Sequence, residues 1–128
     1  MQQPTEGELA ILSVLWRLGG ATVREVNDRL NDDSDKPIGY TTTLKLMQLM
    51  ADKGLVSRDT SSRSHVYTAI AGRERTQQGL LRRFVDATFG GSRTQLVLRA
   101  LGESNATPDE LAEIKRLIEE LEKEENHA

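Results

Sequence analysis

One side of residues 41–52 carries polar side chains at helical spacing that could form hydrogen bonds with a ligand lying along the helix. The four members of this stripe are Thr41, Lys45, Gln48 and Asp52. Their separations of four, three and four residues place them on one face of an α-helix. Lysine can donate hydrogen bonds to the guanine acceptors in the DNA major groove, and the glutamine amide can form hydrogen bonds with adenine. The spacing therefore favours Lys45 and Gln48 as side chains that contact base edges, and a solvated helix face is the alternative.

The amino end of the same segment offers groups that suit phosphate oxygens. Tyr40, Thr41 and Thr42 supply hydroxyls beside the first backbone N–H groups of the predicted helix. A simpler interpretation is that Thr41 caps the helix, as threonine often does. Both can hold, because one threonine can cap while its neighbour contacts phosphate.

Basic residues follow in a predicted strand–turn–strand segment. Arg58 lies in the first strand, Arg63 lies near the turn, and His65 lies in the return strand. We expect Arg58 and Arg63 to contact DNA, with Arg63 on a phosphate or in the minor groove. A solvated turn arginine is the alternative for Arg63, and His65 is interpreted as packing on the sheet.

These groups need a scaffold, and the periodicity of apolar residues supplies one. We expect Trp16, Met47 and Met50 in its core. A Thr22–Glu25 pair has the spacing of a capping box. The predicted order is three helices (8–18, 22–30 and 41–53) and a hairpin of strands (55–59 and 64–69). This order predicts a mainly α fold with a small β-hairpin, a winged helix-turn-helix whose third helix would enter the major groove.

The rest of the chain is predicted to be helical, over residues 73–88, 92–101 and from Thr107 onward. Short amphipathic helices bury little by themselves, and a symmetric dimer is an economical way to cover them. We therefore expect a DNA-binding domain over residues 1–72 and a helical dimerisation region over residues 73–128. The dimerisation residues are predicted to be Leu96, Val97, Leu101, Leu111, Ile114, Leu117, Ile118 and Leu121. Four arginines could contact either the DNA backbone or the other subunit: Arg73, Arg75, Arg82 and Arg83.

Composition narrows the function classes. The chain has 128 residues, a net charge of −3 and no cysteine, so thiolate metal sites, disulfides and cysteine nucleophiles are excluded. The negative net charge means that any DNA-binding surface is a local patch. We find no phosphate-binding glycine loop, metal constellation or nucleophile–base pair, and we therefore expect no enzyme activity, metal or cofactor. With no signal peptide or apolar run of membrane length, a cytoplasmic protein is expected.

Residues 39–69, GYTTTLKLMQLMADKGLVSRDTSSRSHVYTA, resemble the penicillinase-repressor family, the BlaI/MecI/CopY group. Glu8-Leu9 through Trp16 looks like the family's first helix. Tyr40-Thr41-Thr42 and Lys53-Gly54-Leu55-Val56 look like the two ends of its recognition helix and the start of its wing. Gly90-Gly91 before Gln95-Leu96-Val97-Leu98 looks like its dimerisation region. The likeness covers nearly the whole chain in order.

The resemblance implies a dimeric repressor that binds a palindromic double-stranded operator. Some members of the family are inactivated by proteolysis that a membrane sensor triggers, so a regulatory protease acting on the dimerisation region is a further possible partner. The family's Asn–Phe cleavage pair is replaced here by Arg99-Ala100, and the cysteine cluster of the copper-responsive branch is absent. Lys45 and Leu49 stand where the family often has Thr and Arg, so a different operator is expected.

Two other functions stay open at this point. A winged helix can bind proteins, and the negative net charge would suit such an adaptor, although the Thr–Lys–Gln stripe favours DNA. A repressor controlled directly by a small molecule is the other alternative.

Overall fold

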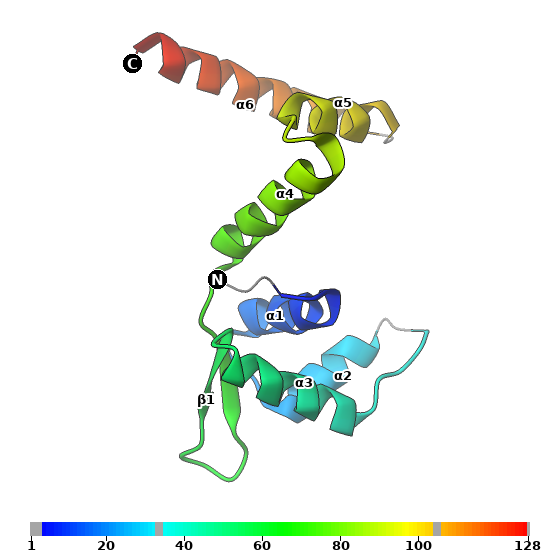
Figure 1. The fold of residues 1–128 in the computed structure, drawn as a ribbon, viewed down its shortest axis with the longest axis vertical. Helices are drawn as coiled ribbons and strands as arrows, with labels where there is room; N and C mark the ends of the chain where they lie inside the picture. The colour runs from blue at the N-terminus through cyan, green and yellow to red at the C-terminus, as the bar shows by residue number, and fades with distance from the viewer. Residues whose placement is uncertain (1–3, 33–34, 104–105, 128) are drawn as a thin grey trace. The chain divides into compact units, whose positions relative to one another are not determined.

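The computed structural model describes residues 4–32, 35–103 and 106–127. The chain divides into two compact units, residues 1–83 and 84–128. The first unit holds helices α1 (Glu6–Leu18), α2 (Val23–Asp32) and α3 (Tyr40–Asp52), then strands β1 (Val56–Asp59) and β2 (Val66–Ala69). This order is the predicted winged helix, which the structure confirms (Figure 1).

The first helix begins earlier than the apolar periodicity indicated. Thr5 caps α1, because its Oγ1 accepts the Glu8 N–H at 3.2 Å while Glu8 Oε1 accepts the Thr5 N–H at 2.9 Å. The sequence prediction began the helix at Glu8 and missed this reciprocal capping box. The second box was predicted and is confirmed, with Thr22 and Glu25 bonding each other in the same way before α2.

The core of the first unit lies between the three helices and the hairpin. Apolar side chains from each of these elements are buried together, and α1 contributes the largest share. The cluster contains Ile11, Leu12, Val14, Leu15, Ala21, Val23, Val26, Met47, Met50, Leu55, Val56 and Tyr67. Trp16 packs against this cluster but is only half-buried, and its indole N–H donates to the Ala71 carbonyl at 2.9 Å.

The hairpin is antiparallel and pairs Val56 with Ala69 and Asp59 with Val66. Strand β2 also pairs with the link between α1 and α2, where Ala21 and Tyr67 exchange two backbone hydrogen bonds of 3.0 and 2.8 Å. The strands are shorter than predicted, so residues 60–65 form the loop. His65 was expected to pack on the sheet, and this was wrong, because its side chain lies exposed in that loop.

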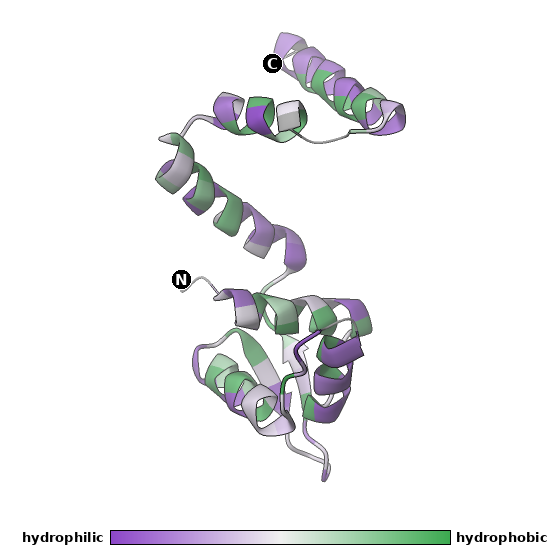
Figure 2. Ribbon diagram, turned by 90° about the vertical axis from the view of Figure 1, so that its right-hand side faces the viewer, coloured by the Kyte–Doolittle hydropathy of each residue, from purple (hydrophilic) through white to green (hydrophobic). Residues whose placement is uncertain are grey.

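Three further helices complete the chain: α4 (Arg73–Phe89), α5 (Arg93–Glu103) and α6 (Pro108–His127). Thr107 and Glu110 form a capping box before α6, which agrees with the predicted start of a helix at Thr107. In the described part of residues 84–128, Val85 is the only apolar side chain that is buried. Figure 2 shows hydrophobic and hydrophilic residues alternating along α6. Most of the described apolar side chains of the second unit are therefore at least partly exposed.

Candidate nucleic-acid interface

Helix α3 has one face in the core and the other in solvent. Thr43, Met47 and Met50 are buried, whereas the opposite face is exposed. Leu46 is half-buried and packs against the core cluster. The exposed face carries Thr41, Thr42, Lys45, Gln48, Leu49 and Asp52. Lys45 lies near the middle of this face, so the helix presents its predicted polar stripe outward.

Two asparagines of α2 hold the chain where it enters α3. The buried Asn27 donates to the Ile38 carbonyl at 3.0 Å and to the Thr43 hydroxyl at 2.8 Å. Asn31, one turn later, donates to the same carbonyl at 2.9 Å and accepts the Ile38 N–H at 2.8 Å. Because buried amides are costly to leave unpaired, this network fixes the position of α3 against α2. Sequence reasoning did not find it.

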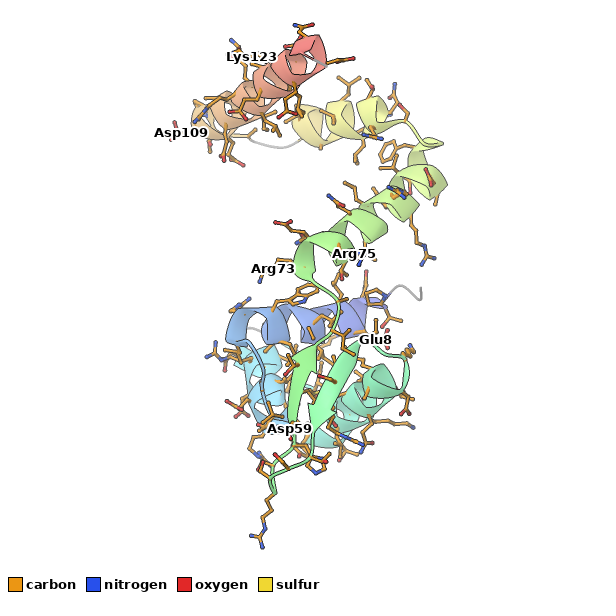
Figure 3. The ribbon with its side chains drawn as sticks, turned by 90° about the vertical axis from the view of Figure 1, so that its left-hand side faces the viewer. Glu8, Asp59, Arg73, Arg75, Asp109 and Lys123 are labelled. Atoms are coloured by element: carbon orange, nitrogen blue, oxygen red, sulfur yellow. The ribbon has the colours of Figure 1, made fainter. Side chains whose placement is uncertain are left out.

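An ion pair holds the other end of α3. The Lys53 ammonium lies 2.8 Å from Glu8 Oε2, which joins the end of α3 to the first turn of α1. Figure 3 labels Glu8 in the first unit. Its side chain is only 3% exposed. Burial raises the pKa of Glu8, but the hydrogen bonds from Lys53 and from the Thr5 N–H outweigh it and hold the pKa below its ordinary value of 4.5. The carboxylate is therefore stabilised in the folded state.

We expect a Glu8→Gln variant to lose about 1–2 kcal/mol of unfolding free energy at pH 7. Glutamine keeps the size and the capping position, so the change isolates the charge. A lowered pKa in the folded state stabilises the protein above the pKa of the unfolded chain, and this contribution disappears as the pH falls through the folded value. Urea unfolding between pH 7 and pH 3 should therefore show the gap to the unmodified protein closing below about pH 4.5. A gap that stays constant over this range would contradict the role of the charge.

The amino end of α3 is capped by Gly39, whose φ is −69° and which has no side chain to cap with. The expectation that Thr41 caps the helix was wrong, because α3 begins at Tyr40 and Thr41 lies inside its first turn. The Thr41 and Thr42 side chains are both exposed. The first N–H groups of a helix lack intrahelical acceptors, so this end presents donors that can bind an anion.

Sequence reasoning missed Arg24 beside this end. Its guanidinium carbon lies 4.9 Å from the centre of the Tyr40 ring, and both side chains are exposed. The contact places a cation next to the start of α3. Arg24 and Tyr40 are 16 positions apart, so no local pattern in the sequence indicates their contact.

The arginines of the hairpin are exposed. Arg58 lies on β1 opposite Tyr67, and Arg63 lies in the loop. Asp59, at the end of β1, accepts the Ser61 N–H at 2.9 Å, and this backbone hydrogen bond lowers the pKa of the Asp59 carboxyl. The carboxylate of Asp59, labelled in Figure 3, therefore lies at the end of β1 where the loop that carries Arg63 begins.

The residues predicted to form the dimer interface lie on α5 and α6. Leu96, Leu101 and Ile114 are half-buried. The others are exposed: Val97, Leu111, Leu117, Ile118 and Leu121. Leu98 and Phe84, which the prediction left out, are also 59% and 51% exposed.

The parts of the chain that the structure describes contain neither a metal-binding cluster nor a membrane-spanning helix. No group of three or more His, Asp or Glu side chains there could hold a metal ion. Among the same residues, no helix has both the length and the apolar character needed to cross a membrane.

Comparison with known proteins agrees with this architecture. The penicillinase repressor family matches residues 4–120. Two curated relatives, both called transcriptional regulator BlaI, come from the CDC 1551/Oshkosh and H37Rv strains of Mycobacterium tuberculosis. Each is 32% identical over 117 residues, which cover 90% of this chain and 82% of the relative. The chain belongs to the penicillinase repressor family.

Proposed function

We propose that this transcriptional repressor binds a palindromic DNA operator as a homodimer. The observation that carries the proposal is the division of α3 into a buried face and an exposed polar face centred near Lys45. Bonds at both ends of the helix hold that exposed face in place, through Asn27 at one end and Lys53 at the other. A rigid helix with exposed donors is what direct reading of the major groove requires.

In this proposal the contacts divide into two classes. Lys45 and Gln48 reach base edges and supply sequence preference. The groups around them bind phosphates and fix the register of the helix on the duplex. These phosphate-binding residues are Arg24, Tyr40, Thr41, Thr42, Arg58 and Arg63.

The dimer would form through α5 and α6. The apolar stripe of α6 contains Leu111, Ile114, Ile118 and Leu121, which recur at spacings of three, four and three residues, with Leu117 beside them. All five are at least partly exposed in the single chain. A second copy would cover them and place two α3 helices about one DNA turn, ~34 Å, or a multiple of it apart. The palindrome of the operator follows from the two-fold symmetry of such a dimer.

Derepression would require loss of the dimer or of the protein. Arg99 and Ala100 occupy exposed positions within α5, where the resemblance places the family's Asn–Phe cleavage pair. A protease that regulates this protein would therefore need a different recognition sequence or a different position. We propose that β-lactam-triggered cleavage at the family's position does not act on this chain.

Selection of bound sequences from a random DNA pool, with a salt titration on the selected site, tests the proposal. Enrichment of a palindrome whose affinity falls steeply with salt is the expected result, because phosphate contacts release counterions. No enrichment at low salt would refute operator binding. It would favour a protein-interaction adaptor whose partner binds α3.

A Lys45→Ala variant should weaken specific binding by roughly 1–3 kcal/mol per half-site, the size of one good base contact. Its fold should be unaffected, because Lys45 is exposed. Binding isotherms on the selected operator and on an unrelated duplex measure the loss of preference. Lys123→Ala on α6 removes a lysine side chain outside the proposed DNA contacts and should leave the affinity for the operator unchanged. Equal affinities of the Lys45→Ala and unmodified proteins for the operator would remove Lys45 from the proposed contacts.

A further inference from the structure

The exposed face of α3 contains one aliphatic side chain beside its polar stripe. Leu49 is 43% exposed and lies one turn after Lys45. It does not belong to the buried cluster of the first unit, nor to the apolar residues packed against that cluster. Single exposed leucines are common on proteins, so its meaning depends on the surface around it. Here that surface is the one proposed to enter the major groove.

We propose that Leu49 contacts the C5-methyl group of a thymine in each operator half-site and so helps to determine specificity. The inference rests on the proposed DNA binding and adds a residue and a base to it. The thymine methyl is the apolar group that distinguishes base pairs in the major groove, where the other groups are hydrogen-bond donors and acceptors. A leucine has no donor or acceptor, so it can recognise only that group.

The position of Leu49 supports this assignment. Residues 45 and 49 are four apart and lie side by side on the helix surface. If Lys45 donates to a base edge, Leu49 lies over the same stretch of the major groove. Its side chain is then no longer in contact with water. A leucine facing a polar base edge would leave that edge without its water, whereas one facing a methyl buries apolar surface on both sides. The base that faces Leu49 is therefore expected to be a thymine.

Deoxyuridine provides an atomic test, because uracil keeps every hydrogen bond of thymine and lacks only the methyl. The selected operator would be remade with each thymine replaced in turn by deoxyuridine, in both half-sites together. Affinities would be measured for the unmodified protein, for Leu49→Ala, and for Gln48→Ala as a neighbouring variant that keeps the leucine. Thermal unfolding of each variant checks that folding is retained.

Replacement of the one thymine that faces Leu49 should lower the affinity of the unmodified protein about fourfold per half-site. This factor corresponds to the transfer free energy of one methyl-sized group. The same replacement should change the affinity of Leu49→Ala by less than about 1.5-fold. Gln48→Ala should bind more weakly overall and keep the full sensitivity to uracil.

Two results would overturn the inference while leaving operator binding intact. One is insensitivity of the unmodified protein to every replacement, and the other is an equal sensitivity in Leu49→Ala. A protein that selects no DNA sequence would refute the proposed function and this inference with it.

Discussion

A variant carrying Ile118→Glu and Leu121→Glu should be monomeric and should bind the operator roughly 10²- to 10⁴-fold more weakly than the unmodified protein. Both side chains are about half exposed in the single chain and lie on the apolar stripe of α6. In a symmetric dimer the two substitutions would place four carboxylates in the interface, and unpaired buried charges are strongly unfavourable. Losing the link between two binding modules removes an avidity of that size.

Sedimentation equilibrium measures the mass of the protein in solution and so distinguishes a monomer from a dimer. Binding isotherms on full and half operators measure the affinity. Lys123→Glu is a suitable control, because it adds negative charge on the opposite side of the same helix. It should leave the protein dimeric. A double variant that remains a dimer would show that the interface lies outside the apolar stripe of α6.

Replacing Met47 with alanine should lower the unfolding free energy by about 2–5 kcal/mol. Met47 is completely buried on the inner face of α3, where it belongs to the core cluster of the first unit. The substitution removes apolar contacts and leaves a cavity that the helices can only partly fill. For a small domain this loss is a large fraction of the total stability.

Urea unfolding followed by circular dichroism measures this effect. Gln48→Ala changes the next residue on the solvent side of the same helix and should alter stability by less than about 0.5 kcal/mol. A loss below about 1 kcal/mol for Met47→Ala would show that α3 is not anchored through this side chain. Helix α3 packs in the core and is proposed to contact DNA, and two variants should separate these roles. Met47→Ala should lower the stability, and Lys45→Ala should lower the sequence preference.

The local signals in the sequence predicted the elements of the winged helix, but not the bonds between them. The Thr22–Glu25 box and the two faces of α3 depend on residues a few positions apart, and such spacings are visible in a sequence. The bond of Asn27 to Ile38, and the ion pair between Glu8 and Lys53, join residues 11 and 45 positions apart. They exist only once the helices have packed, so no periodicity could indicate them.

Errors arose where a local pattern continued past the end of its element. Alternation through residues 64–69 predicted a longer strand, and the expectation for His65 followed from it. Pairing ends at Asp59 and Val66, so His65 has no strand neighbour to pack on. Thr41 was a plausible cap by residue type, but the helix starts one residue earlier and Gly39 takes the capping position. The Thr5–Glu8 box was legible in the sequence and was overlooked.

The contact of Trp16 with the start of α4 gives this protein a built-in optical probe. Trp16 is the only tryptophan in the chain, its N–H bonds to Ala71, and the Arg73 guanidinium lies 5.8 Å from the centre of its ring. Indole emission responds to hydrogen bonding and to nearby charge. Fluorescence of the unlabelled protein therefore reports on this one junction, and any movement of α4 away from α1 during operator binding would appear as a spectral shift.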